Sequence, residues 1–379
     1  MRRYPAYDPP EYVTWQPEGE LVRRFNERLR ADADRWRIVR SLSAERLVDL
    51  YRGMVRFRLH DITLQRWVKQ GIISKAWLGT GEEAVTVGAV HALRRGPSGD
   101  VVGPMIRNAG ACHEMGMPVA DMLRAYLATA DAPSRGRDLH FGSLEHGIVA
   151  PVSMVGGLAT VVNGYALAFL RRGEDRVALT WVGDGSTKNG AVHEALNFAA
   201  VGRLPVVFVL QNNQVALGTR LSQHHRAPGF SDWGKAYGMP LFEVDGNNVL
   251  DVHAAAVQAI ARCRRGEGPV FLAAETFRMG GHATHDVREA RTTLEAALFA
   301  EWGRRDPIGN FEEYLIRCGL PPREDGDPAA SDANVRDLLA RAEEEVSQEV
   351  DAAAESALAS RHRHPPPDAG APEECYGRT

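Results

Sequence analysis

The sequence has few cysteines, no long hydrophobic run and no excess of basic residues. Its four cysteines stand far apart without a CxxC pair, which excludes a disulfide framework and offers no zinc-binding spacing. No stretch reaches the roughly 18 apolar residues that a transmembrane helix requires, so we expect no membrane contact. Lys plus Arg number 45 and Asp plus Glu 49, giving a net charge of −4. This balance argues against nucleic-acid binding, because phosphate contacts require a basic excess.

The N-terminal stretch, MRRYPAYDPPEYVTWQPEGE, contains no apolar core and carries early acidic residues. It therefore lacks the pattern of a signal or transit peptide. Lysine is scarce, whereas arginine and alanine are abundant, a composition that points to a bacterial source. We accordingly expect a cytoplasmic, bacterial protein.

Composition divides the chain into four segments. Residues 1–42 are proline-rich and then charged, and we expect them to form an extended arm over the surface. Residues 43–320 carry the pattern of one folded domain. Residues 321–360 contain a helical pattern that Asp332 can cap. Residues 361–379 are proline-rich, and we expect a disordered tail.

The middle of the chain alternates between short apolar runs and helical patterns. Such alternation is typical of βαβ units and of a parallel sheet with helices on both faces. The sequence therefore predicts an α/β fold with helical extensions toward both termini, in which ligands bind at the carboxyl ends of the strands. The expected strands are 176–183, 204–211, 242–246 and 269–277, and the expected helices are 43–71, 151–172, 188–201, 249–265 and 288–302.

Polar residues follow two consecutive predicted strands. Asp184, between Gly183 and Gly185, follows the first strand, and Asn213 follows the second. Because the carboxyl ends of parallel strands meet at one edge, Asp184 and Asn213 should face the same pocket. A carboxylate and an amide oxygen, completed by waters and phosphate oxygens, suit Mg²⁺. A helix beginning near Gly190 would direct its N-terminus at this pocket and favour a phosphate.

An Asp-Gly pair after a strand is more often only a turn, but the longer pattern is specific. The segment GDGSTKNGAVHEALNFAAVGRLPVVFVLQNNQVALGT matches the thiamine-diphosphate-binding motif. Over residues 43–320, in colinear order, the chain resembles the alpha subunit of the decarboxylating component of 2-oxo acid dehydrogenase complexes. This group acts on pyruvate, branched-chain 2-oxo acids or acetoin. The resemblance implies the thiamine-diphosphate-binding fold.

The resemblance also implies a set of site residues. Asp184 and Asn213 correspond to the side-chain ligands of Mg²⁺, and the backbone carbonyl of Val215 corresponds to a third ligand. Arg107, in GPMIRNAGACHEMG, corresponds to an arginine that contacts the diphosphate. The remaining implied cofactor contacts are Gly183, Gly185 and Ser186 along the diphosphate, and Gly147, Ile148 and Val149 beside the aminopyrimidine.

The segment ETFRMGGHATHDVREARTT resembles the mobile loop over the active site of this family. His282 corresponds to a histidine that assists the reaction and contacts the cofactor. A lone loop histidine is usually only solvent-exposed, but the two preceding glycines and the position after strand 269–277 favour function. Four positions depart from the family pattern: Ile106 replaces a common tyrosine, Val215 a usual aromatic residue, Gln211 a charged residue, and Ala283 a serine found in mammalian relatives. The choice among 2-oxo acids therefore stays open.

The implied reaction is thiamine-diphosphate-dependent oxidative decarboxylation of a small 2-oxo acid, with acyl transfer to a lipoyl group on an acyltransferase component. In this family a beta subunit supplies half of the cofactor site, so we expect a heterotetramer of two alpha and two beta chains. An acetoin dehydrogenase alpha subunit and a non-catalytic partner-binding subunit remain alternatives. The chain length and the GGHATHD loop disfavour a transketolase-like synthase, and no GxGxxG supports a nicotinamide-binding protein.

Overall fold

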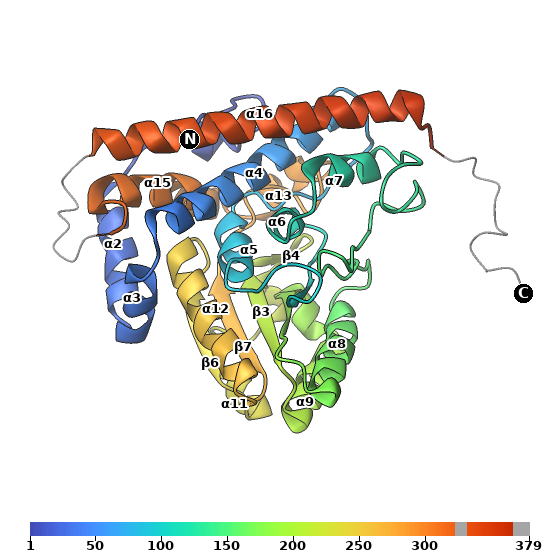
Figure 1. Cartoon of the computed structure of the whole chain (residues 1–379). Helices are drawn as coiled ribbons and strands as arrows, with labels where there is room; N and C mark the ends of the chain where they lie inside the picture. Colours follow the sequence, from blue (N-terminus) through green and yellow to red (C-terminus); the bar gives the residue numbers. More distant parts are fainter. Residues whose placement is uncertain (323–331, 367–379) are drawn as a thin grey trace, which may run out of the picture.

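A computed structural model describes residues 1–322 and 332–366. A five-stranded parallel sheet lies at its centre (Figure 1). The strand order is β1-β2-β3-β7-β6, and every neighbouring pair is parallel. The strands are β1 (Val101–Gly103), β2 (Ala178–Gly183), β3 (Val206–Asn212), β6 (Leu241–Asp245) and β7 (Val270–Glu275), with a separate hairpin of β4 (Val215–Ala216) and β5 (Thr219–Arg220). The α/β fold predicted from the sequence is thereby confirmed.

Side chains alternate between the two faces of the sheet, as the pleat requires. Val207 and Val209 of β3 belong to a core cluster that also includes α4 (Ala44–Lys69), α5 (Glu83–Val90) and α12 (Val249–Arg264). The alternate residues Val206, Phe208 and Leu210 pack in a second cluster, with α8 (Leu158–Arg172) and α9 (Gly190–Gly202). Both faces of the sheet are therefore covered by helices.

The direction in which the strands are added reverses between β3 and β7. The helices α8 and α9 precede β2 and β3 and belong to one face, whereas α12 connects β6 to β7 on the other face. In open parallel sheets, ligands bind at the carboxyl ends of the strands beside such a reversal. The fold therefore places the candidate site at the ends of β2, β3 and β7.

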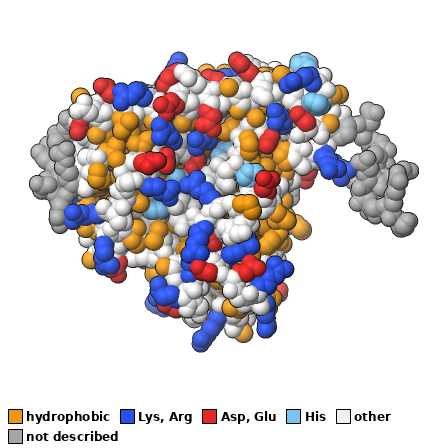
Figure 2. Space-filling view, viewed as in Figure 1, with side chains coloured by type: hydrophobic (Ala, Val, Ile, Leu, Met, Phe, Trp, Pro, Cys, Tyr) orange, Lys and Arg blue, Asp and Glu red, His pale blue; other side chains and the backbone are white. Residues whose placement is uncertain are grey.

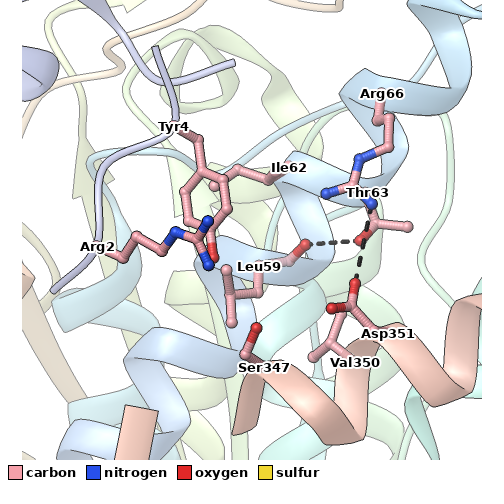
Figure 3. A pocket seen from close by; sticks show the side chains of 9 residues that line it. All are labelled: Arg2, Tyr4, Leu59, Ile62, Thr63, Arg66, Ser347, Val350 and Asp351. Atoms are coloured by element: carbon pink, nitrogen blue, oxygen red, sulfur yellow. Dashed lines mark hydrogen bonds and ion pairs between the residues drawn. The ribbon is translucent and has the colours of Figure 1, made fainter. Parts of the chain in front are cut away.

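The longest helix, α16 (Ala333–Arg363), crosses the top of the molecule over α4 and α7 (Val119–Tyr126) (Figure 1). Figure 2 shows charged side chains of both signs along this outer edge. A cavity of about 210 Å³ lies where α16, α4 and the N-terminal segment meet. Figure 3 shows the side chains that line it: Arg2, Tyr4, Leu59, Ile62, Thr63, Arg66, Ser347, Val350 and Asp351.

Several local predictions need correction. Residues 1–42 are not an extended arm, because they contain α1 (Pro10–Val13), α2 (Gly19–Arg30) and α3 (Ala33–Arg40). Burial of Val22, Phe25 and Leu29 on one side of α2 stabilises this segment against the domain. The helix expected over 288–302 is two helices, α13 (Val287–Thr293) and α14 (Ala296–Arg304), separated by extended backbone at Leu294.

At the C-terminal end, α16 continues past the expected boundary at residue 360. Most of the tail predicted to be disordered, residues 367–379, lies outside the described residues, as do residues 323–331. The remaining described helices are α6 (Ala109–Glu114), α10 (Leu221–His224), α11 (Trp233–Tyr237), α15 (Pro307–Cys318) and the 3₁₀ helix η1 (Gly185–Lys188). Across the described part of the chain, no helix is long and apolar enough to cross a membrane.

Candidate active site at the carboxyl ends of the strands

Asp184 lies directly after β2 and is 1% exposed. Its Oδ2 atom is buried and has no hydrogen-bond partner among the described residues. Nε2 of His224 in α10 lies 3.3 Å from Oδ2, but burial and the charge of Lys188 lower the pKa of His224, so this ring is neutral near pH 7 and does not neutralise Asp184. Burial raises the pKa of Asp184 to about 6, and the neighbouring Glu82 carboxylate acts in the same direction. An unpaired buried carboxylate of this kind is costly unless a cation joins it.

Asn213 follows β3 and is 4% exposed. Its Nδ2 donates to Oε1 of Glu82 at 2.8 Å, and its Oδ1 lies 3.4 Å from the backbone nitrogen of Val215. Val215 is buried and pairs with Arg220 in the β4–β5 hairpin. The intervening Gln214 has a φ of +73°, so the chain turns sharply between the two predicted metal ligands. The structure thus brings Asn213 and Val215 together after β3.

Glu82 is a site residue that the sequence did not reveal. It is fully buried, directly before α5, and its Oε1 accepts hydrogen bonds from Gln211 and Asn213. Its Oε2 has no hydrogen-bond partner among the residues described and lies 3.7 Å from Nη1 of Arg107. The pair Glu82-Glu83 at the start of an apolar helix is the only signal in the sequence, and acidic residues are common there for the helix dipole alone.

Two buried guanidinium groups lie opposite these carboxylates. Arg107 donates from Nη1 to the carbonyl of Leu78 at 2.9 Å. Arg278, after β7, donates from Nη2 to the carbonyl of Leu217 at 2.8 Å and is 1% exposed. Burial and the like charge of Arg107 lower the pKa of Arg278 to about 10. The positive charges of Arg107 and Arg278 repel each other in this buried site. An anion bound beside both guanidinium groups would offset that repulsion.

His282 is half-buried on the loop that follows β7, and its Nδ1 accepts from Nη2 of Arg107 at 3.3 Å. Burial, together with the positive charges of Arg107 and Arg278, lowers the pKa of His282 to about 4. The imidazole is therefore neutral near pH 7 in this state. The loop is held by bonds between Thr284 and Ala76. The mobility that the sequence suggested for residues 279–293 stays a prediction.

Close packing explains the glycine at the start of η1. A Cβ on Gly185 would lie 2.5 Å from the Cβ of Ala216, so only glycine fits against the hairpin. Ser186 is buried in η1. The helix expected near Gly190 begins only after η1, and the Asn189 side chain already caps it by accepting from Ala191 at 3.0 Å. The backbone N–H groups nearest Asp184 thus belong to η1 rather than to α9.

The other predicted cofactor contacts lie farther along the sheet edge. Gly147, Ile148 and Val149 run beside β1, where Val102 donates to the carbonyl of Gly147 at 2.8 Å and Val149 donates to that of Val102 at 2.9 Å. Gly147 has a φ of +69°, and a Cβ there would lie 2.5 Å from the carbonyl oxygen of Asp100. Gly183 ends β2 without such crowding. This segment therefore borders the site from β1 and makes no hydrogen bond to Asp184 or Asn213 within the described residues.

We refer to Glu82, Arg107, Asp184, Asn213, Arg278 and His282 as the edge site. Within the described part of the chain, no group of three or more His, Cys, Asp or Glu side chains could hold a metal by itself. A cation at Asp184 and Asn213 would therefore depend on oxygens from outside the side chains, which is usual for Mg²⁺ bound with phosphate. The orphaned carboxylate and the two guanidiniums fit a magnesium ion and a diphosphate side by side.

Comparison with known proteins matches residues 51–360 to the family Dehydrogenase E1 component. The 3-methyl-2-oxobutanoate dehydrogenase subunit alpha of Mycobacterium tuberculosis is 36% identical over 282 residues, covering 74% of this chain and 73% of that protein. The 2-oxoisovalerate dehydrogenase subunit alpha of Bacillus subtilis is 34% identical over 282 residues, covering 74% and 84%. The pyruvate dehydrogenase E1 component subunit alpha of Zymomonas mobilis is 30% identical over 316 residues, covering 83% and 84%.

Proposed function

Because the chain belongs to the Dehydrogenase E1 component family, we propose that it is the alpha subunit of a 2-oxo acid dehydrogenase. The resemblance drawn from the sequence motif is confirmed by the family match. The reaction is the thiamine-diphosphate-dependent oxidative decarboxylation of pyruvate or a branched-chain 2-oxo acid, with acyl transfer to a lipoyl group. The relatives named for branched-chain substrates and for pyruvate support this class of substrate without selecting one member.

Bound thiamine diphosphate supplies the thiazolium that accepts the electron pair released when CO₂ leaves. The residues of this chain hold and orient that cofactor. Arg107 and Arg278 present buried positive charge to the diphosphate, and Gly183, Gly185 and Ser186 lie beside Asp184, where the backbone can approach closely. Gly183 ends β2, and Gly185 and Ser186 begin the 3₁₀ helix η1, so this backbone is already folded around Asp184.

We propose that a magnesium ion binds beside the diphosphate. Asp184 would bind the ion through its orphaned Oδ2, Asn213 through Oδ1, and Val215 through its backbone carbonyl. The absence of any hydrogen-bond partner for Oδ2 among the described residues supports the assignment of Asp184. The sharp turn at Gln214 supports the assignment of Val215, because it brings that residue next to the Asn213 amide. Gly147, Ile148 and Val149 would support the aminopyrimidine end from β1.

His282 is the residue of this chain best placed to move a proton during the reaction. Its Nδ1 accepts from Arg107, which leaves Nε2 as the protonated nitrogen of the neutral ring. A diphosphate bound to Arg107 and Arg278 would cancel much of the positive charge that lowers the pKa of His282. The pKa would then rise toward the range in which histidine serves as a general acid or base.

A beta subunit and a lipoyl-bearing acyltransferase component are the proposed partners, with two alpha and two beta chains in the assembly. Exposed apolar side chains support a protein partner, because they gather on α8, on α9 and on the segment before α8. A groove of about 420 Å³ lies between these two helices. Figure 2 shows that hydrophobic side chains also reach the surface on the face of the molecule drawn there. The exposed residues are Val152, Met154, Val155, Val161, Leu170, Phe198 and Val201. The lysine-poor, arginine-rich composition supports a bacterial source, and we propose a cytoplasmic location.

One observation carries this proposal: Oδ2 of Asp184 is buried without a hydrogen-bond partner among the described residues, at the sheet edge where the neighbouring strands β3 and β7 lead to Asn213 and Arg278. The test is turnover of a 2-oxo acid panel by the chain co-purified with its beta partner, with thiamine diphosphate, Mg²⁺ and an artificial electron acceptor. We expect turnover of pyruvate or of a branched-chain 2-oxo acid. Turnover of acetoin alone would select the acetoin dehydrogenase alternative, and no turnover with bound cofactor would favour a non-catalytic subunit.

A further inference from the structure

A chain of buried polar side chains runs behind the proposed metal ligands. The Asn108 amide donates to Thr86 Oγ1 at 2.7 Å and to Gln211 Oε1 at 2.9 Å. The Gln211 amide then donates to Oε1 of Glu82, and so does the Asn213 amide at 2.8 Å. All five side chains are at most 4% exposed. The network connects α5, the loop after β1 and the end of β3.

Glu82 fixes how two side-chain amides are turned, those of Gln211 in β3 and of Asn213 directly after it. Oε1 of Glu82 accepts a hydrogen bond from each amide, so both amides direct their NH₂ groups toward it. The Asn213 Oδ1 atom is thereby turned away from Glu82, toward the side of Val215. An amide turned the other way would place two donors, instead of an oxygen, at the metal position. The orientation that a metal ion requires is thus set by a neighbour that does not touch the metal.

Glu82 also faces the cationic side of the site. Its Oε2 has no hydrogen-bond partner within the described residues and lies 3.7 Å from Arg107 Nη1, the group proposed to contact the diphosphate. Arg107 itself is fixed by the carbonyl of Leu78. One carboxylate therefore lies between the amide that would hold the metal and the guanidinium that would hold the phosphate.

We propose that Glu82 is a positioning residue of the edge site, which orients the Asn213 amide for a divalent cation while its second oxygen faces Arg107. The inference rests on the proposed function, since it assigns a role toward the Mg²⁺ and diphosphate of that site. Gln211 is part of the same arrangement, because its amide also donates to Glu82. The role of Glu82 is exerted through Asn213, not by contact with substrate.

The adjacent carboxylate provides a matched control. Glu83 is equally buried, but its oxygens bind Arg58 and the backbone nitrogen of Gly81, away from the edge site. Glu83→Gln should lower the melting temperature of the complex without changing its cation affinity. Glu82→Ala and Glu82→Gln should change the cation affinity, which separates a positioning role from a purely structural one.

The experiment uses the alpha–beta complex and Mn²⁺ as a spectroscopic probe for the divalent cation, titrated by electron paramagnetic resonance at saturating thiamine diphosphate. Glu82→Ala should weaken Mn²⁺ binding by about 10-fold to 100-fold, the range seen when a group that orients a metal ligand is removed. Glu82→Gln retains an accepting oxygen and should lose less. In an Asn213→Ala background, Glu82→Gln should cause less than a further twofold change.

Wild-type Mn²⁺ affinity in both Glu82 variants would overturn the inference while leaving the proposed function intact. Equal losses from Glu82→Gln with and without the Asn213 side chain would also overturn it, because the effect would not pass through that amide. If the wild-type complex itself bound no Mn²⁺ with thiamine diphosphate, the proposed function would fail instead. Should Glu82→Ala not fold, Glu82→Gln in the two backgrounds still decides the question.

Discussion

Glu82 and Glu83 are adjacent, fully buried carboxylates that lie in two differently built groups of charges. Glu83 pairs directly with the buried Arg58, which also reaches Asp306 at 3.2 Å, and Asp306 in turn binds Arg3. We call Arg3, Asp8, Arg58, Glu83 and Asp306 the structural ion cluster. Its carboxylates Glu83 and Asp306 each contact a guanidinium of the same chain.

The edge site is arranged differently. Among the described residues of this site, the shortest distance between a guanidinium nitrogen and a carboxylate oxygen is 3.7 Å, from Arg107 to Glu82. Oδ2 of Asp184 has no hydrogen-bond partner among the described residues. Arg107 and Arg278 donate to backbone carbonyls instead. Removing one partner of a buried ion pair leaves an uncompensated charge and destabilises the fold, whereas buried charges that are not paired with one another are available to a ligand. The contrast predicts opposite consequences for substitutions in the two groups.

We expect the largest effect from a substitution in the structural ion cluster, which should lower the free energy of unfolding. Glu83→Gln leaves Arg58 buried with one charged partner fewer, which should cost about 3 kcal/mol of unfolding free energy. Chemical denaturation of the complex without cofactor measures this loss. Thiamine diphosphate affinity of the folded variant should stay within about twofold of wild type, since Glu83 does not contact the edge site. A large loss of affinity would mean that the two groups of charges are coupled.

Asp184→Ala should produce the reverse pattern. The variant lacks the carboxylate opposite the cation, so thiamine diphosphate affinity should fall by about 2–3 kcal/mol, as for the loss of a charged contact. Stability without cofactor should not fall, because burial already disfavours the ionised Asp184 side chain. Calorimetric titration and a thermal melt of the same preparation give both quantities. Unchanged cofactor binding would remove Asp184 from the site.

His282→Ala tests chemistry within the edge site rather than binding. Turnover should fall by about 100-fold, a size typical of general acid–base groups. Thiamine diphosphate affinity should change much less than in Asp184→Ala, because Arg107 keeps its bond to the Leu78 carbonyl. Steady-state kinetics at saturating cofactor measure the first effect and titration the second. Full turnover by the variant would show that His282 is not a reacting group.

The smallest expected effect concerns pH. The pKa of Asp184 is raised to about 6, so the folded chain binds this proton more tightly than an ordinary aspartate does. Below pH 6 a cation must displace that proton before it can bind Asp184. The Mg²⁺ affinity should therefore fall by up to about tenfold for each pH unit below 6, and it should become independent of pH above about 7. Titrations at several pH values measure the slope. Asp184→Asn should retain only the slope that protonation of the diphosphate itself contributes.

The sequence predicts the sheet better than it predicts the segments around it. The apolar runs that became β2, β3, β6 and β7 are long enough to be recognised, whereas β1 has three residues in a glycine-containing stretch and was missed. The helices within residues 1–42 were missed because proline and charge dominate the composition there. Their stability comes from contacts with the domain, such as the burial of Phe25 and Leu29.

The candidate site was predictable where the fold rule for strand ends applies. Asp184 and Asn213 follow β2 and β3, and parallel strands must bring such residues to one edge. Glu82 and His224 come from other parts of the chain, and only tertiary packing places them beside Asp184 and Asn213. The sequence of the adjacent residues Glu82 and Glu83 does not indicate which carboxylate contacts the edge site and which contacts Arg58.

We propose that the edge site holds a magnesium ion and a diphosphate between Asp184, Asn213 and the two arginines. A crystal structure of the alpha–beta complex grown with thiamine diphosphate and Mg²⁺ tests it most directly. We expect Mg²⁺ at about 2.1 Å from an oxygen of Asp184 and from Oδ1 of Asn213, with diphosphate oxygens completing the octahedron. A diphosphate bound elsewhere, or an Asp184 side chain left uncoordinated beside it, would show that the edge site is not the magnesium–diphosphate site.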